Sequence, residues 1–263
     1  MDNQEQQVPF ARILRDSALE LLLTSVMLFG VTTIVRWVIG PSPISRAIPQ
    51  IHAELLIVGA GVGILIAGLI LSPAGKITGG HMNPAISLAM WRFGVFPGGG
   101  VVPYVVAQLL GSVLGVLIAR SVWGPVVAEA PVAYAVLQPG LGWSSVTLFA
   151  AETVSMGTII LIVGLCLASP RLASFVPWIV GAAIGIAIAL LGTSTGGSVN
   201  PARQFGPAVL SGETRFLWVY LLAPMAGALL AAWLREFIQR HRFVLTHRLC
   251  GTNRDGSALS VNR

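Results

Sequence analysis

Residues 79–85, Gly-Gly-His-Met-Asn-Pro-Ala, and residues 196–202, Gly-Gly-Ser-Val-Asn-Pro-Ala, decide the fold of this chain. In each stretch a pair of glycines precedes Asn-Pro-Ala, and the second copy follows the first by 117 residues. Asparagine is a favoured N-cap residue, and proline fits the first helical position because its missing N–H would have no partner there. Each stretch therefore predicts a glycine-rich loop that leads into the N-terminus of a helix.

The sequence around these two stretches is that of a membrane protein. Hydrophobic residues make up 55% of the 263 residues and charged residues only 10%, whereas soluble domains carry about 25% charged residues. Six apolar stretches are long enough to cross a hydrocarbon core; they lie near residues 17–39, 51–72, 101–122, 146–168, 174–194 and 215–236. We expect helices, because an open strand cannot satisfy its backbone in lipid.

The pattern also predicts an inverted repeat. Two further apolar segments, near 83–92 and 200–210, begin with Asn-Pro-Ala and are too short to span. Residues 104–111 and 220–227 share a tyrosine, an alanine and a glycine at matching positions. Each half thus has three spans and one short helix, and because three is odd, the second half enters the membrane from the opposite side. The predicted fold is all-α, with six transmembrane helices and two half-helices.

The chain is expected to divide into a membrane region over 17–236 and two tails. The repeats cover about 17–122 and 146–236, a polar N-terminal tail covers 1–16, and a basic C-terminal tail covers 237–263. The charges of the C-terminal tail are expected to face solvent or lipid headgroups.

The loop charges predict how the protein is oriented. Eleven of the 16 Lys and Arg residues fall on the side of both termini and four on the other. Because positive loops favour the cytoplasm, we expect cytoplasmic termini in a multi-pass integral membrane protein. The polar N-terminus is not a signal peptide, and the length is compatible with a bacterial inner (plasma) membrane. No nucleic-acid partner is expected, since the basic residues lie in tails and short loops without aromatic interleaving.

The two short helices predict a specific site near the middle of the membrane. If they enter from opposite faces, their N-termini meet with the positive dipole ends pointing inward. The amides of Asn83 and Asn200 can then donate to a passing oxygen atom, and the loop carbonyls of 79–82 and 196–199 can accept. Facing positive ends disfavour cations, including a hydrated proton. A neutral solute with an oxygen acceptor suits such a site.

The sequence resembles the aquaporin, or major intrinsic protein, family. The resemblance rests on residues 79–85, on 104–111 (Tyr-Val-Val-Ala-Gln-Leu-Leu-Gly) and on 200–208 (Asn-Pro-Ala-Arg-Gln-Phe-Gly-Pro-Ala), and it extends from about Glu20 to Leu234. It implies a homotetramer with one pore in each subunit, no cofactor and no metal. The pore motifs that it implies are Asn83, Pro84, Ala85, Asn200, Pro201 and Ala202.

Four further residues match the outer selectivity filter of the family. Arg203 follows the second motif directly, and its guanidinium is expected to bind the solute and repel cations. Spacing from the motif asparagines gives Gly63, Ile188 and Gly197 as the other positions. Strict water channels of the family have a bulky aromatic residue in place of Gly63 and a histidine in place of Ile188. The resemblance therefore implies a wider and less polar opening.

The resemblance also assigns roles to three polar residues near the pore loops. Matching glutamates in the family hold the pore loops by hydrogen bonds, which implies that role for Glu20 and Glu152. In a coupled transporter such carboxylates could instead carry a proton. His81 is interpreted as a structural residue of the first pore loop. After Arg203, Gln204 fits neither the water-channel nor the glycerol-channel pattern.

These features together predict a passive channel for water and small uncharged solutes such as glycerol, which excludes ions and protons. A wide-pore channel for urea or metalloid acids is one alternative, and a coupled secondary transporter is another. We do not expect an enzyme, because the sequence contains no nucleophile–base arrangement, metal cluster or phosphate loop. The expected partners are water, small neutral solutes and the lipid bilayer.

Overall fold

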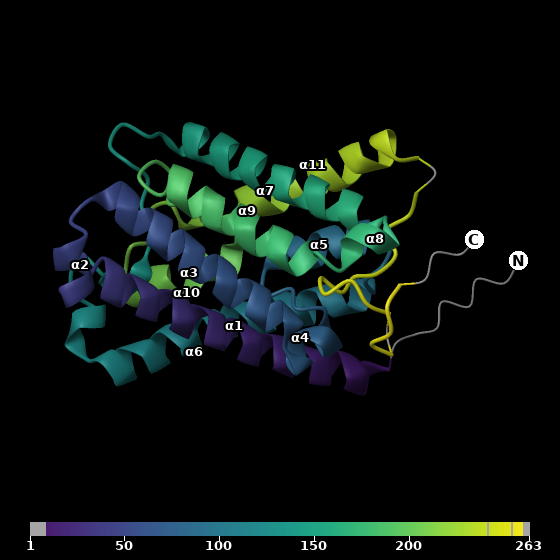
Figure 1. Ribbon diagram of the computed structural model, residues 1–263, viewed down its shortest axis with the longest axis horizontal. Coiled ribbons are helices and arrows are strands. Elements are labelled where there is room, and N and C mark those ends of the chain that lie inside the picture. Colours follow the sequence, from purple (N-terminus) through teal and green to yellow (C-terminus); the bar gives the residue numbers. More distant parts are fainter. Residues whose placement is uncertain (1–8, 241, 254, 260–263) are drawn as a thin grey trace, which may run out of the picture.

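A computed structural model describes residues 9–240, 242–253 and 255–259. Its long helices run roughly parallel to the longest axis of the molecule and form one bundle (Figure 1). The six long helices are α1 (Phe10–Val38), α3 (Ile51–Leu71), α6 (Gly98–Trp123), α7 (Ser145–Leu167), α9 (Val176–Leu191) and α11 (Leu217–Ile238). The two half-helices are α5 (Pro84–Arg92) and α10 (Pro201–Ser211). Short helical turns complete the described chain: α2 (Pro43–Ala47), α4 (Pro73–Thr78), η1 (Pro125–Val127), η2 (Ala133–Ala135) and α8 (Pro170–Ala173).

The observed helices correspond to the predicted spans, and the all-α fold with two half-helices is confirmed. Five of the six long helices are long and apolar enough to cross a membrane, and α9 is a shorter apolar helix of 16 residues. The largest difference lies at the start of α1, which begins at Phe10 rather than near residue 17. The additional turns carry three charged residues among four apolar ones, and Arg12 and Asp16 form an i,i+4 ion pair there with a distance of 3.5 Å. Hydropathy could not find this extension because these turns lie beyond the apolar stretch.

The half-helices begin where the Asn-Pro-Ala motifs predict. Asn83 and Asn200 are the N-caps of α5 and α10, and each side chain accepts a hydrogen bond from a backbone N–H of its first turn. The prolines that follow occupy the first helical positions. Each half-helix is short, with 9 residues in α5 and 11 in α10. At 1.5 Å per residue each covers about half of a 30 Å hydrocarbon core.

Helix packing follows the inverted repeat. Helix α6 packs along α1 and helix α11 along α7, while α3 packs on α9 between the two halves. Glycines allow these close approaches: a Cβ atom at Gly111 would lie 2.4 Å from the carbonyl oxygen of Leu21, and one at Gly227 would lie 2.2 Å from that of Thr153. Gly111 and Gly227 occupy matching positions of the repeat. The same contact is therefore built twice, which explains why both halves contain a glycine at this point.

The chain after α11 differs from the prediction that its charges face solvent or lipid headgroups. Residues 242–253, which we call the C-terminal segment, turn back across the end of the bundle where α1 begins (Figure 1). We call this end the terminal end. Arg248 and Leu249 are buried there, with 4% and 0% of their surfaces exposed. The expectation that the charges of this tail face solvent or lipid headgroups was wrong for Arg248, because Leu249 beside it buries apolar surface that the surrounding arginines conceal in the composition.

We expect Gly227→Val to lower both the yield and the melting temperature of the purified protein. The added side chain collides with the α7 backbone, so helices α7 and α11 must separate and lose packing on both sides. Thermal unfolding in detergent measures the effect. Gly68→Val is the matched control, because Gly68 lies in α3 with nothing within 4 Å of its Cβ position. Equal melting temperatures for the two variants would contradict this account of the helix contact.

Candidate functional site: a pore built from two re-entrant loops

Both pore loops use backbone conformations that only a few residue types adopt easily. In the first loop φ is +103° at Gly79, +66° at Gly80 and +47° at Met82. The second loop repeats the pattern, with +85° at Gly196, +61° at Gly197 and +44° at Val199. Glycine reaches the left-handed region without strain, whereas a β-branched residue there is an outlier. The loops are therefore held in place by contacts from the surrounding helices.

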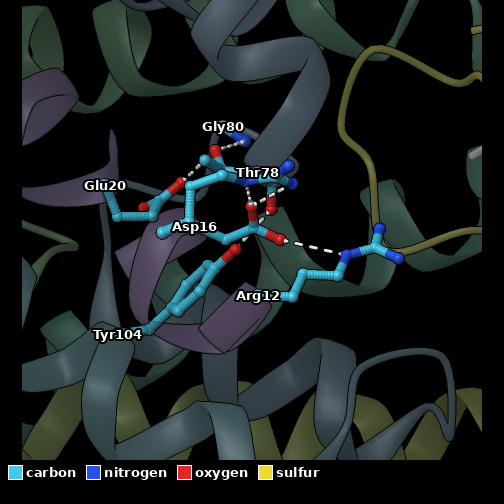
Figure 2. A network of polar contacts seen from close by, with 7 residues as sticks. Arg12, Asp16, Glu20, Thr78, Gly80 and Tyr104 are labelled. Atoms are coloured by element: carbon cyan, nitrogen blue, oxygen red, sulfur yellow. Dashed lines mark hydrogen bonds and ion pairs between the residues drawn. The ribbon is translucent and has the colours of Figure 1, made fainter. Parts of the chain in front are cut away.

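Glu20 supplies these contacts for the first loop. Its Oε1 accepts hydrogen bonds from the Thr78 hydroxyl at 2.6 Å and the His81 N–H at 3.0 Å. Its Oε2 accepts from the Met82 N–H at 2.7 Å and from the Gln108 amide at 2.8 Å. Figure 2 shows Glu20 pointing from α1 toward Thr78, whose carbonyl oxygen accepts from the Tyr104 hydroxyl at 2.9 Å. The carboxylate thus satisfies loop N–H groups that neither helix nor water could satisfy at this depth.

Glu152 has the same place in the second half. Its two oxygens accept from the N–H groups of Ser198 at 3.2 Å and Val199 at 2.8 Å. The Tyr220 hydroxyl donates to the Thr195 carbonyl at 2.7 Å, as Tyr104 does in the first half. Both glutamates are fully buried. The structure therefore brings each glutamate onto the loop of its own half.

The two motif asparagines meet at the centre of the molecule. The side-chain amide of Asn83 donates to the Val199 carbonyl at 3.0 Å, and that of Asn200 donates to the Met82 carbonyl at 3.0 Å. Each amide nitrogen carries two hydrogens, so one is used to join the loops and the other is free to point elsewhere. The N-termini of α5 and α10 thus face each other across the pore, with their positive dipole ends together.

A vestibule of about 390 Å³ leads to this centre from the end of the bundle opposite the terminal end. Apolar side chains of α1, α3 and α9 form one wall of the vestibule, among them Val31, Val58, Val62 and Ile188. Polar groups form another wall of the vestibule, and they are Ser198, Asn200, Arg203 and the backbone of Gly196 and Gly197. A solute here meets hydrogen-bonding groups along one side and apolar surface along the other.

Arg203 and Gln204 tie the second half-helix to a loop of the vestibule. The Arg203 Nη1 donates to the Ala135 carbonyl at 2.7 Å. The Gln204 side chain both donates to the Leu137 carbonyl at 2.8 Å and accepts from the Leu137 N–H at 3.0 Å. Within the described part of the chain, no hydrogen bond engages the Nη2 and Nε atoms of Arg203. These nitrogens are available to a solute in the vestibule.

The family is decided by comparison with known proteins. The family model described as "Major intrinsic protein" matches residues 7–235, nearly the whole membrane region.

The chain belongs to the major intrinsic protein family.

Curated relatives agree with this membership. The probable aquaporin AqpM of Archaeoglobus fulgidus is 36% identical over 194 residues, which cover 70% of this chain and 76% of that protein. The probable aquaporin NIP7-1 of Arabidopsis thaliana is 30% identical over 213 residues, covering 80% and 72%. Among solved structures, the aquaglyceroporin from Plasmodium falciparum is similar with a TM-score of 0.68 and 20% identity, covering 88% of this chain and 97% of that one. This last similarity shows the fold.

Of the filter residues predicted in this major intrinsic protein, the structure brings three together and separates one. Ile188, Gly197 and Arg203 all lie along the vestibule. Gly63 instead faces α9, where a Cβ atom would lie 2.5 Å from the carbonyl oxygen of Gly181. Val62, one residue earlier, lines the vestibule from α3. The placement of Gly63 on the pore is therefore corrected: residue spacing across the loop before Asn83 does not fix which face of α3 turns inward.

Sequence reasoning missed the loop that lines the vestibule and the contacts of Gln204 with it. Residues 131–138 line the vestibule, and their carbonyls engage Arg203 and Gln204. Gln204 stood out in the sequence because it fits neither family pattern, which was a usable signal. Its partner Leu137 is 67 residues away in the chain, so the contact could not be read from the sequence.

Replacing Glu20 by glutamine should lower the free energy of unfolding by about 1–3 kcal/mol. The glutamine side chain has an NH₂ group in place of one carboxylate oxygen, so the backbone N–H groups that bound that oxygen lose their acceptor. Melting temperatures in detergent measure the loss. Glu213→Gln is the control, since Glu213 is exposed. If both variants have the same melting temperature as the parent protein, Glu20 does not hold the loop.

Proposed function

We propose that this chain is a passive channel that conducts water and small uncharged solutes such as glycerol, and that it excludes ions and protons. The observation that carries the proposal is the crossed pair of asparagine amides at the meeting point of two helix N-termini. A neutral oxygen-bearing solute gains hydrogen bonds there in place of those that it loses to water. A cation meets two positive dipole ends and the Arg203 guanidinium.

The breadth of the vestibule supports passage of solutes larger than water. Aliphatic side chains make up its apolar wall, and no aromatic residue or histidine is among the described residues that line it. Val62 and Ile188 stand at positions where bulkier groups would narrow the opening. The apolar wall suits the carbon backbone of a polyol, while Arg203 and the Gly197 backbone suit its hydroxyl groups. Urea and metalloid acids are further candidates on the same grounds.

A proton-coupled transporter is less well supported. That mechanism needs a carboxylate that can change protonation as the solute passes. Glu20 accepts four hydrogen bonds, two of them from backbone N–H groups. Glu152 likewise accepts from two backbone N–H groups. Protonating either one would remove an acceptor from a loop N–H group, so these carboxylates are better suited to holding the loops than to carrying protons.

We further propose that the terminal end faces the cytoplasm and that the protein assembles as a homotetramer. The orientation rests on the excess of Lys and Arg on that side. An apolar groove between α3 and α9 supports the assembly: small residues such as Gly59 and Ala60 line it beside Trp178, so another subunit could pack closely. Residence in a bacterial inner membrane stays a prediction from the sequence.

Stopped-flow light scattering of proteoliposomes tests the proposed function. We expect osmotic water flux and glycerol flux above those of empty liposomes, with no accompanying proton current. Arg203→Val should admit protons or small cations, because the charge that repels them is removed. Arg215→Val is the control, since Arg215 is exposed. The proposal fails if no form of the chain, including variants with a displaced C-terminal segment, exceeds empty liposomes for either solute.

The position of the constriction can be tested on α3. We expect Val62→Trp to reduce glycerol flux toward the level of empty liposomes and to reduce water flux less, because an indole would fill the vestibule beside Arg203. Ile57→Trp is the matched control on the same helix, since Ile57 is 36% exposed and lines neither the vestibule nor the groove between α3 and α9. An equal effect of the two substitutions on the ratio of glycerol to water flux would remove Val62 from the lining of the constriction.

A further inference from the structure

The terminal end of the pore differs from the vestibule at the other end. On the side of the terminal end, the cavity that adjoins the two motif asparagines is about 10 Å³, which is roughly the space that one water molecule requires. Its lining includes Asn83, Asn200, His81, pore-facing apolar side chains of α1, α3 and α9, and one residue from outside the membrane region, Leu249. Leu249 is fully buried. The C-terminal segment therefore inserts a leucine side chain into the conduction path.

The backbone of the segment occupies the hydrogen-bonding groups of the first pore loop. The Leu249 N–H donates to the Gly79 carbonyl at 3.0 Å. The His247 carbonyl lies 3.0 Å from His81 Nε2; since a carbonyl only accepts, His81 is the donor. A water molecule leaving the pore at this end would need these same groups. The segment thus excludes solute both by volume and by using the loop's acceptor and donor.

Contacts on both sides of Leu249 hold the segment in this position. Upstream, the Leu245 N–H donates to the Leu167 carbonyl at the end of α7, at 3.1 Å. The His247 ring packs on Phe96 with ring centroids 5.4 Å apart. Burial lowers the pKa of His247 well below its ordinary value, so the ring is neutral at pH 7 and suited to this apolar contact.

Downstream, Gly251 allows the chain to pass against α8. Its φ is +69°, and a Cβ atom there would lie 2.2 Å from the Ala173 carbonyl oxygen. The Thr246 hydroxyl donates to the Thr252 carbonyl at 3.0 Å and accepts from the Arg248 N–H at 3.1 Å, which closes the segment into a compact turn. The Arg248 side chain also donates to the Asn253 carbonyl. The turn is thus braced by its own hydrogen bonds and seated by a glycine that has no room for a side chain.

We propose that the C-terminal segment is an autoinhibitory plug: docked as in the structure, it closes the terminal end of the pore through Leu249, and its release opens the channel. The proposal rests on the proposed channel function and adds a closed state to it. Release would break only non-covalent contacts with the first pore loop, namely the Leu249–Gly79 and His81–His247 hydrogen bonds, the packing of the His247 ring on His81 and the apolar contacts of Leu249.

The test compares Gly251→Val with Gly256→Val in the full chain. Both glycines have positive φ, +69° and +85°, so both substitutions strain the backbone, but nothing lies within 4 Å of the Cβ position of Gly256. We expect Gly251→Val alone to undock the segment and to raise osmotic water permeability per channel several-fold, measured by stopped-flow light scattering. Gly256→Val should behave as the parent.

Cys250 reports independently on docking. It is 5% exposed in the docked segment, and Cys166 is the second cysteine of the chain. In a Cys166→Ala background, maleimide should label Cys250 slowly in the parent and rapidly in Gly251→Val. Rapid labelling of the parent would overturn the proposal, since the segment would then not be docked.

Leu249→Ala is the second variant, which shortens the plugging side chain and leaves the backbone contacts possible. Loss of a buried leucine's apolar surface should shift the docked-to-released ratio by roughly tenfold or more, and permeability should rise. Leu245→Ala is its control, because Leu245 is 44% exposed in the same segment. Equal permeability of the parent and both Leu249→Ala and Gly251→Val, all well above empty liposomes, would overturn the plug and leave the channel function intact. If all stay at the level of empty liposomes while Cys250 becomes reactive, both proposals fail.

Discussion

The need to satisfy backbone hydrogen-bonding groups at membrane depth is the constraint on which the whole structure depends. A channel must expose backbone to its solute, yet lipid offers unwound backbone no partner. Glu20 and Glu152 meet this constraint by accepting the N–H groups of the two pore loops. Because these N–H groups are bound to the glutamates, the loop carbonyls that neither the asparagine amides nor the C-terminal segment engage are left for the pore. The asparagine amides then join the loops to each other, so that two strained segments become one rigid centre.

The inverted repeat builds this arrangement twice from the same set of contacts. One set of contacts, a glutamate on the first helix of a half and a tyrosine hydroxyl on the last, is used twice. The two halves differ where they serve opposite ends of the pore. In the second half Arg203 and Gln204 follow the motif and engage the vestibule loop. In the first half the loop has a different partner, the C-terminal segment. The symmetry thus builds both pore loops in the same way, and the departures from it give each loop a different partner, the vestibule loop at one end and the C-terminal segment at the other.

The two ends of the pore differ in how much space they leave for a solute. The vestibule is open and amphipathic, with a volume of about 390 Å³, whereas the cavity beyond the asparagines has only about 10 Å³. A pore needs both ends open to conduct, so the conformation described here is closed at the terminal end. The residues responsible lie outside the six spans and would be absent from any account limited to the family motifs.

The spans, the two half-helices and the inverted repeat could be predicted from the sequence, because hydropathy and the Asn-Pro-Ala capping pattern are local properties of the chain. The sequence also identified Glu20, Glu152 and Arg203, since a charge within an apolar stretch is costly and therefore conspicuous. The sequence could not reveal that Val62 rather than Gly63 faces the vestibule, because that depends on the rotation of α3 against α9. Only the tertiary structure showed where Gln204 binds and where Leu249 lies, because their partners are distant in sequence. A leucine among arginines carries no periodic signal, and its burial depends entirely on the cavity that the rest of the chain forms.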